Sequence, residues 1–224
     1  MKYKVEKSIW TQDDFEQMGW HDCRIHKIHL SKDLKLDIDY ILKWNKPDLE
    51  GLPFTFWIVP ATLVFKEIKG FEFEIDTIDL SEIEIDSIKR DIKDGKLFWT
   101  IITRIGDVEF ESSGYVQFLR QEPFYKFEQS LTYNERNGYS FEQTTNQENP
   151  KRNDTHQIEL EKKNQRDYEN VKKRQLQRIE KEKLEKKLLN HEIKTKDYLI
   201  KKRELKDKIE FYDYWLKNTI FKGW

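Results

Sequence analysis

The sequence predicts an α+β protein in which a mainly antiparallel, β-rich body, a meander sheet or a sandwich, precedes a long helical C-terminal region. Apolar side chains occupy every second position from Leu34 to Trp44, which is the period of a strand with one buried face. Asp94-Gly95 and Gly106-Asp107 are typical of tight hairpin turns between alternating segments. Residues 156–218 contain neither Gly nor Pro and are rich in Lys, Glu, Leu and Gln, which favours helix.

The first elements are expected to be a short helix and a central hairpin. Residues 8–19 carry apolar groups at near-helical spacing, with Ser8 or Thr11 as the cap and Gly19 as the end. Residues 20–44 then predict two strands joined at Ser31-Lys32-Asp33. This loop would place Leu30 opposite Leu34, Ile28 opposite Leu36 and Lys27 opposite Asp37. A bulge near Ile25 or His26, or burial on both faces, would accommodate the residues before Ile28.

Further strands follow in an antiparallel meander. The continuous apolar run from Phe54 to Phe65 predicts a strand covered on both faces, with Pro60 at an edge, a bulge or a break. Phe71, Phe73 and Ile75 predict the next strand. The turn at Asp94-Gly95 would oppose Ile92 to Leu97 and Ile88 to Ile101. The turn at Gly106-Asp107 would oppose Ile105 to Val108 and Arg104 to Glu109.

Three regions are expected along the chain: the β-rich body over residues 1–132, a polar linker over 133–155, and a long helix or helical hairpin over 156–224. This segment, a linker or a poorly ordered strap, is rich in Asn, Gln, Thr and Glu and contains Gly138 and Pro150. A hairpin would break near Asn190-His191. The seven-residue spacing between residues 184 and 216 is typical of a coiled coil, although polar side chains interrupt it. The residues expected to associate are Leu184, Leu188, Leu205, Ile209, Tyr212 and Leu216, either between copies of the chain as a homo-oligomer or within this chain.

Charge is divided unevenly between the two ends. Residues 151–224 hold 22 basic and 14 acidic side chains, so the net charge of −1 combines an acidic body with a basic tail. The charged residues at the N-terminus do not fit a signal peptide, and no apolar run approaches the ~20 residues of a membrane span. The single cysteine, Cys23, excludes an internal disulfide and favours a reducing compartment. We expect a cytoplasmic protein that has no membrane partner.

A row of carboxylates gives the main candidate for partner binding. Between Gly70 and Ile88 there is no Lys or Arg, and acidic residues recur at two-residue spacing, which places them on one face of a strand. Such a face is either the solvated side of a half-buried strand or a surface that attracts a basic partner. The candidate residues are Glu72, Glu74, Asp76, Glu82, Glu84 and Asp86.

Two other kinds of site are conceivable. His21, Asp22, Asp37 and Asp39 carry metal-ligand groups, but Lys27 opposite Asp37 would repel a cation, so a structural role is favoured. Cys23 is expected to be a buried, unreactive thiol. The sequence contains no phosphate-binding or nucleophile motif, and we expect no catalytic residue, metal or other cofactor. The lysine clusters at 172–174, 186–187 and 201–203 could bind nucleic acid, although interleaved glutamates weaken their field.

Three strings carry a resemblance to known proteins: Trp20-His21-Asp22-Cys23, Asp37-Ile38-Asp39-Tyr40 and Pro60-Ala61-Thr62-Leu63-Val64-Phe65. They resemble a family of uncharacterised bacterial proteins. The His-Asp start followed by an aliphatic hairpin is also similar to the β-rich immunity proteins encoded beside polymorphic toxins. The resemblance covers roughly residues 10–120 and implies a shared fold and, for the immunity proteins, a cytoplasmic binder that blocks a toxin.

The functional expectation is a non-enzymatic, cytoplasmic protein-interaction module, an immunity or defence factor whose acidic strand face binds a basic protein. The first alternative is an assembly or nucleic-acid-associated protein that acts through the basic C-terminal helix. The second alternative is a metal-dependent hydrolase built on His21, Asp22, Asp37 and Asp39.

Overall fold

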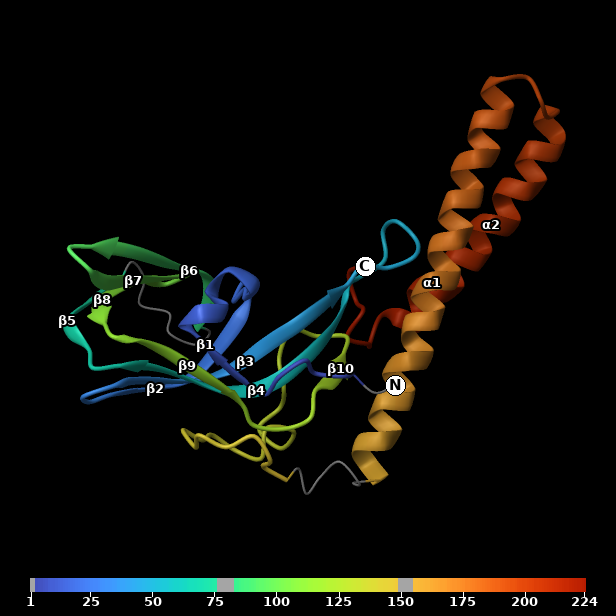
Figure 1. Ribbon diagram of the computed structural model, residues 1–224. Coiled ribbons are helices and arrows are strands. Elements are labelled where there is room, and N and C mark those ends of the chain that lie inside the picture. The colour runs from blue at the N-terminus through green and yellow to red at the C-terminus, as the bar shows by residue number, and fades with distance from the viewer. Residues whose placement is uncertain (1–2, 76–82, 149–154) are drawn as a thin grey trace. The chain divides into compact units, whose positions relative to one another are not determined.

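The computed structural model describes residues 3–75, 83–148 and 155–224, and it confirms the α+β fold class. The chain divides into two compact units. One unit contains Met1–Asn45 and Thr55–Arg152, and the other contains Lys46–Phe54 and Asn153–Trp224. The first is built on strands and the second on helices (Figure 1).

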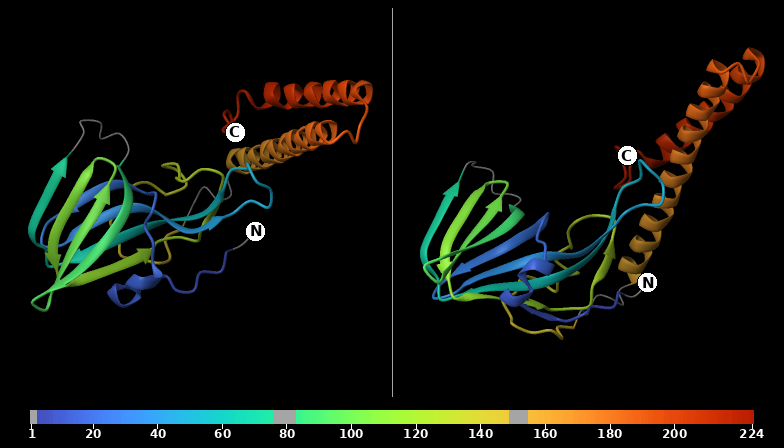
Figure 2. Two further views of the ribbon diagram at one scale, coloured as in Figure 1. Left: turned by 90° about the horizontal axis from the view of Figure 1, so that it is seen from above. Right: turned by 45° about the horizontal axis from the view of Figure 1, so that its top comes forward.

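The first unit is one antiparallel sheet in the order β1-β9-β4-β3-β2-β6-β7-β8-β5, with β10 beside β4. Figures 1 and 2 show that the sheet curves strongly, so that β6, β7 and β8 lie opposite β2, β3 and β4. The strands are β1 (Ile9–Thr11), β2 (Cys23–Leu30), β3 (Leu34–Asn45), β4 (Thr55–Lys66), β5 (Lys69–Ile75), β6 (Ile83–Lys93), β7 (Lys96–Thr103), β8 (Gly106–Ser112), β9 (Gly114–Leu119) and β10 (Phe124–Lys126).

The β2–β3 hairpin at the centre of the sheet has the predicted register. Leu30 lies opposite Leu34, Ile28 opposite Leu36 and Lys27 opposite Asp37, and the register shifts between Ile25 and Lys27, where a bulge was one of two expectations. The bulge keeps Cys23 and Ile25 on the core side, because an extra residue reverses the alternation of side chains. Both are buried.

Pro60 lies inside the fully buried strand β4, at the point where one neighbouring strand replaces another. β10 pairs with Phe56–Ile58, and β9 pairs from Ala61 onward. The carbonyl of Pro60 accepts a hydrogen bond from the Arg120 backbone N–H at 2.9 Å. The missing N–H of Pro60 would face the Arg120 carbonyl, which instead accepts a hydrogen bond from the Gln147 backbone N–H at 2.8 Å, so the proline leaves this acceptor satisfied.

The two predicted turns have different outcomes. The hairpin at Asp94-Gly95 is confirmed, with Ile92 opposite Leu97 and Ile88 opposite Ile101. The second register is wrong: the turn lies at Arg104-Ile105, and Thr103 pairs with Gly106. The Thr103 hydroxyl donates to the Gly106 carbonyl at 2.6 Å, which closes this turn locally.

The N-terminal helix is shorter than predicted. Residues Ile9–Thr11 form β1 against β9, and only Gln12–Gln17 are helical, as the 3-10 helix η1. The Asp14 carboxylate accepts a hydrogen bond from the Thr11 backbone N–H at 2.9 Å, which is the reciprocal half of a capping box. The residues expected to form the first helical turn therefore pair with β9 instead.

An aromatic core fills the space between the curved parts of the sheet. Phe65 of β4 packs against Trp99 of β7 and Phe110 of β8, with ring centroids 5.2 and 4.9 Å apart. Tyr115 contacts both Trp99 and Trp20 at 5.6 Å. Edge-to-face pairs of this kind add about 0.5–1.5 kcal/mol each beyond the area they bury.

Residues 133–148, predicted to be part of a polar linker or of a poorly ordered strap, form a strap within the first unit that is hydrogen-bonded to its buried residues. Arg136 is completely buried, and the Ser140 backbone N–H donates to Asp37 at 3.1 Å. The Thr62 hydroxyl donates to the Glu142 carbonyl at 2.8 Å. The polar composition reflects hydrogen bonding to buried groups of β3 and β4, which the sequence pattern alone does not distinguish from exposure to solvent.

The second unit is a helical hairpin, which was one of the two predicted forms. Helix α1 (Thr155–Leu189) and helix α2 (Thr195–Leu216) are separated at residues 190–194, where His191 has a φ of 57°. Leu184, Tyr198 and Leu205 form a buried cluster between the helices. The loop Lys46–Phe54 packs on α1, where Lys172 donates to Asp48 at 2.6 Å. Within the described residues, no helix is long and apolar enough to cross a membrane.

Candidate binding surface

Four carboxylates lie together on the outward face of β5 and β8. Glu72 is directly opposite Glu109, and Glu74 is directly opposite Asp107, so each pair projects to the same side of the sheet. The alternate residues Val108 and Phe110 are buried on the other side. We call Glu72, Glu74, Asp107 and Glu109 the acidic face. All four are exposed.

The acidic face contains two like-charged pairs that oppose the folding of the sheet. Side chains directly opposite each other on antiparallel strands have Cβ atoms roughly 4.5–5.5 Å apart. Like charges at this separation are destabilising, by an amount comparable to the ~0.2–1 kcal/mol that favourable cross-strand pairs contribute. The arrangement therefore weakens the β5–β8 pairing instead of supporting it.

No cation neutralises the acidic face within the described residues. None of its carboxylates has a Lys, Arg or His nitrogen within 4.0 Å in that part of the chain. Glu111, two residues further along β8, differs: Lys96 lies 3.1 Å from it and Lys69 lies 3.9 Å from it. The negative potential is therefore concentrated at the N-terminal end of β8, near Gly106.

A shallow groove of about 300 Å³ runs beside the acidic face. Phe98 and Thr100 of β7 line it, together with four acidic side chains and two lysines: Glu72, Asp91, Glu109 and Glu111, and Lys69 and Lys93. Because β5 is the last strand in the sheet order, the groove and the acidic face lie at an edge of the sheet. An extended chain with basic side chains has the shape and charge to lie along this edge.

The predicted row of carboxylates is divided between two separate strands. Glu72 and Glu74 lie on β5, whereas Glu84 and Asp86 lie on β6, which is separated from β5 by β7 and β8. Glu84 is ion-paired with Arg104 at 2.9 Å and is largely buried. Asp86 lies 3.5 Å from His21. Asp76 and Glu82 lie outside the described residues.

Sequence reasoning missed Asp107 and Glu109 because it placed the preceding turn two residues too late. In that register Glu109 would face Arg104 and would be neutralised. The signal was present in the alternation of Asp107-Val108-Glu109-Phe110-Glu111, which is the pattern of a half-buried strand with an acidic outer side. The turn at Arg104-Ile105 lacks the glycine or asparagine that marks most two-residue hairpins.

The carboxylates of Asp37 and Asp39, candidates for metal binding, are occupied by two arginines. Asp37 accepts hydrogen bonds from Arg120 at 2.7 Å and from Arg136, and Arg136 also donates to Asp39. His26 Nε2 lies 2.9 Å from Asp39. The two aspartate and two arginine side chains are completely buried. Two guanidinium groups balance two carboxylates here, which is a structural arrangement.

His21 and Asp22, the other two metal candidates, do not join this cluster. His21 is exposed, stacks on Trp44 at 6.0 Å between ring centroids, and lies 3.1 Å from the Asp86 carbonyl. Asp22 accepts a hydrogen bond from the Gln129 side chain at 2.7 Å. The described residues contain no group of three or more His, Cys, Asp or Glu side chains placed to hold a metal ion.

Three of the residues predicted for helix association, Leu184, Leu188 and Leu205, pack together inside the hairpin. Leu184, Leu205 and Leu216 are buried, and Leu188 packs against the same cluster as Leu184. Ile209 and Tyr212 are half-buried. The contacts of Leu184, Leu188 and Leu205 join α1 to α2 within one chain. Association between copies through the predicted positions stays a prediction.

Cys23 is buried, and its environment disfavours reactivity. Burial, and to a smaller degree the charges of Asp39 and Asp22, raise the pKa of its thiol to about 12. The thiolate required of a nucleophile is therefore scarce near neutral pH.

Comparison with known proteins adds no assignment: no protein family, no curated protein and no solved structure matches the chain.

Proposed function

We propose that this protein is a non-enzymatic binding module that holds a basic, extended segment of a partner protein along the acidic face. The observation that carries the proposal is the presence of two pairs of opposed carboxylates, Glu72 with Glu109 and Glu74 with Asp107, on the edge strand β5 and its neighbour β8, without ion pairs among the described residues. Such pairs cost folding stability and are relieved when a cation lies between them.

The spacing of the carboxylates suits an extended partner. Alternate residues on a strand are roughly 6.6–6.8 Å apart, and a second extended chain presents its own alternate side chains at the same interval. A partner with Lys or Arg at every second position would match Glu72 and Glu74 in turn. The cytoplasmic immunity or defence role implied by the sequence resemblance is a proposal of the same kind, with a basic toxin as the partner.

The test uses the full chain and a fluorescein-labelled peptide of twelve residues that alternates Lys and Thr. A peptide of the same composition, with six Lys followed by six Thr, is the control for total charge. We expect tighter binding of the alternating peptide in fluorescence anisotropy, and we expect added salt to weaken it because the contacting charges are exposed. Equal affinity for both peptides contradicts the proposed match of spacing.

Matched variants separate the acidic face from the general charge of the protein. Glu72→Gln combined with Glu74→Gln should weaken binding of the alternating peptide about tenfold or more, as removal of two ion pairs of about 1 kcal/mol each would give. Glu142→Gln combined with Glu148→Gln removes the same charge from exposed positions elsewhere in the first unit. If both double variants lose the same affinity, the acidic face is not the binding surface.

A further inference from the structure

A groove of about 990 Å³ in the helical unit runs between one side of α1 and the C-terminal end of α2. Lys163, Arg166 and Lys173 line its α1 side at positions that share one face of the helix. They extend over roughly 15 Å, because an α-helix rises 1.5 Å per residue. Lys217 adds a fourth cation from the end of α2.

Two aromatic side chains line the same groove while exposed to water. Tyr214 is 79% exposed and Trp215 is 56% exposed. Their neighbours Leu216 and Phe221 are almost completely buried, at 1% and 2% exposure. The apolar packing at the end of α2 is therefore provided by other side chains, and Tyr214 and Trp215 do not contribute to it. Exposed aromatic rings beside basic residues are typical of binding surfaces.

The groove also contains a buried acceptor that lacks a hydrogen bond. Asp167 is 4% exposed, and its Oδ2 atom has no hydrogen-bond donor within the described residues. The Nζ atom of Lys163 lies 3.9 Å away, which is an ion pair beyond hydrogen-bond distance. Glu169 is the second acidic side chain in the lining. Four cations against two carboxylates leave the groove net positive.

We propose that this groove binds single-stranded nucleic acid. The four cations would contact successive phosphates, and Trp215 would stack on an unpaired base. An amino group on the base edge could donate to Asp167 Oδ2, as carboxylates accept from exposed base amino groups. A duplex would provide phosphates for the cations but no unpaired base for Trp215. An acidic peptide would leave both the indole face of Trp215 and the Asp167 oxygen without a partner.

The first test measures anisotropy of a fluorescein-labelled twelve-nucleotide single strand of mixed sequence with the full chain at 50 mM salt. We expect binding, and we expect Trp215→Ala to weaken it by between about fivefold and about a hundredfold, the range typical of removing one stacked base. Phe211→Ala is the matched control, because Phe211 is 61% exposed on the same helix and is not part of the groove lining. The single-stranded oligonucleotide should quench tryptophan fluorescence, and this quenching should be smaller in Trp215→Ala.

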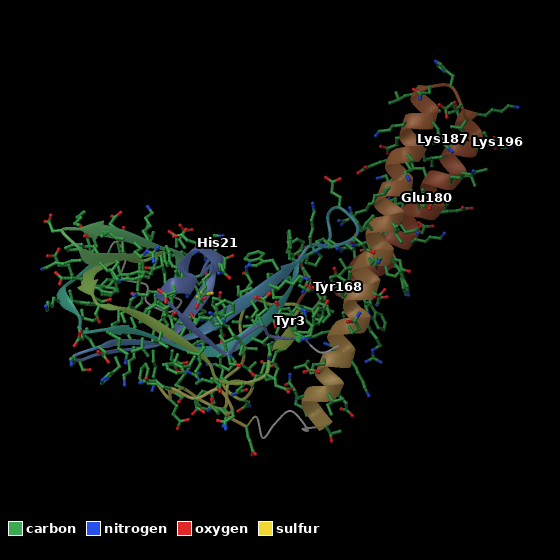
Figure 3. The ribbon with its side chains drawn as sticks, in the orientation of Figure 1. Tyr3, His21, Tyr168, Glu180, Lys187 and Lys196 are labelled. Atoms are coloured by element: carbon green, nitrogen blue, oxygen red, sulfur yellow. The ribbon has the colours of Figure 1, made fainter. Side chains whose placement is uncertain are left out.

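The second test separates the groove from the general positive charge of the hairpin. Arg166→Gln combined with Lys173→Gln should reduce the dependence of log K on log salt by about 0.7 for each phosphate that these side chains no longer neutralise. Lys187→Gln combined with Lys196→Gln removes equal charge near the connection between the helices, at the opposite end of the hairpin from the Tyr168 region (Figure 3), and should change the slope little.

Several outcomes overturn the proposal. These are no binding at low salt, equal losses in the groove and connection variants, equal losses in Trp215→Ala and Phe211→Ala, and binding of the matching duplex as tight as that of the single strand. Tighter binding of an acidic peptide than of the strand would assign the groove to a protein partner. Circular dichroism of each variant verifies that the helices are retained, so a loss of binding reports on the groove.

Discussion

Asp37 shows how a few buried polar residues join distant parts of the first unit. Its carboxylate accepts from Arg120 at the end of β9, and from Arg136 and Ser140 of the strap. Burial lowers the pKa of Arg120, while the adjacent Asp37 and Asp39 charges act in the opposite direction. Removing one partner from such a cluster leaves an uncompensated buried charge, which costs more than the pair contributes in net stability.

We predict that Asp37→Ala lowers the free energy of unfolding by about 3–5 kcal/mol, because both guanidinium groups stay buried without their shared acceptor. Urea denaturation followed by tryptophan fluorescence measures the change. Lys32→Ala is the control, since Lys32 forms an exposed ion pair with Glu67 at 3.3 Å and should cost no more than about 1 kcal/mol. Similar losses in the two variants would contradict the structural role of the cluster.

Cys23 should be inert in the folded protein. With its pKa raised to about 12, less than about one thiol in a thousand is ionised at pH 8. We predict that a disulfide reagent such as Ellman's reagent labels Cys23 at pH 8 only after denaturant unfolds the first unit. Rapid labelling of the native protein would show instead that the thiol is accessible and ionised.

At the scale of elements, the sequence predicts best where a pattern of apolar residues and a strong turn signal agree. The β2–β3 hairpin and the Asp94-Gly95 hairpin have the expected registers because alternation and loop length allow only one alignment. The sequence predicts the next turn at Gly106-Asp107 because this dipeptide is typical of turns. In the structure the turn lies at Arg104-Ile105, and Gly106 begins β8. For residues 133–148 the sequence predicts a linker or a poorly ordered strap, because the buried partners Asp37 and Asp39 are distant in sequence.

The helical hairpin offers a direct comparison of a buried and an exposed leucine. Leu205 is 5% exposed in the cluster between α1 and α2, whereas Leu199 on the same helix is 58% exposed. We predict that Leu205→Ala destabilises the helical unit by about 2–5 kcal/mol through loss of buried apolar volume. Leu199→Ala should change stability by no more than about 0.5 kcal/mol. Thermal denaturation followed at 222 nm measures both, and equal effects would contradict the packing of the hairpin.

Asp33 connects the β2–β3 turn to the end of β4 and to the turn between β4 and β5. The Glu67 backbone N–H, donating at 3.0 Å, and the Lys66 ammonium lower the pKa of the Asp33 carboxyl. A carboxyl whose folded-state pKa lies below its unfolded value stabilises the fold above the unfolded pKa of about 3.9, and loses that contribution as pH falls through the folded pKa.

We therefore predict that the Asp33 carboxyl titrates below about pH 3.9 by NMR, and that hydrogen exchange at the Glu67 amide accelerates, relative to its intrinsic rate, only as pH falls through that lowered pKa. Asp33→Asn should remove this pH dependence. An Asp33 titration at the ordinary aspartate value would mean that the hydrogen bond to Glu67 does not form in solution.

At the scale of the molecule, each unit carries a surface of one charge. The acidic face lies on the first unit, and the cationic groove lies on the second. Composition alone predicted this division of charge between an acidic body and a basic tail. It could not predict the members of the acidic face, because Asp107 and Glu109 join Glu72 and Glu74 only through the β5–β8 pairing, between segments far apart along the chain. Charged side chains on edge strands also prevent pairing with other sheets. A test of the acidic face must therefore measure both partner binding and the stability of the fold.

The most direct test of the acidic face is thermal unfolding of Glu109→Lys, with and without the alternating Lys-Thr peptide. We predict that the variant has a higher Tm than the original chain, because a Lys opposite Glu72 replaces repulsion with attraction. The peptide should raise the Tm of the original chain, because it binds only the folded state, and should leave the Tm of the variant unchanged. A peptide-induced shift of equal size in both proteins would contradict binding at the acidic face.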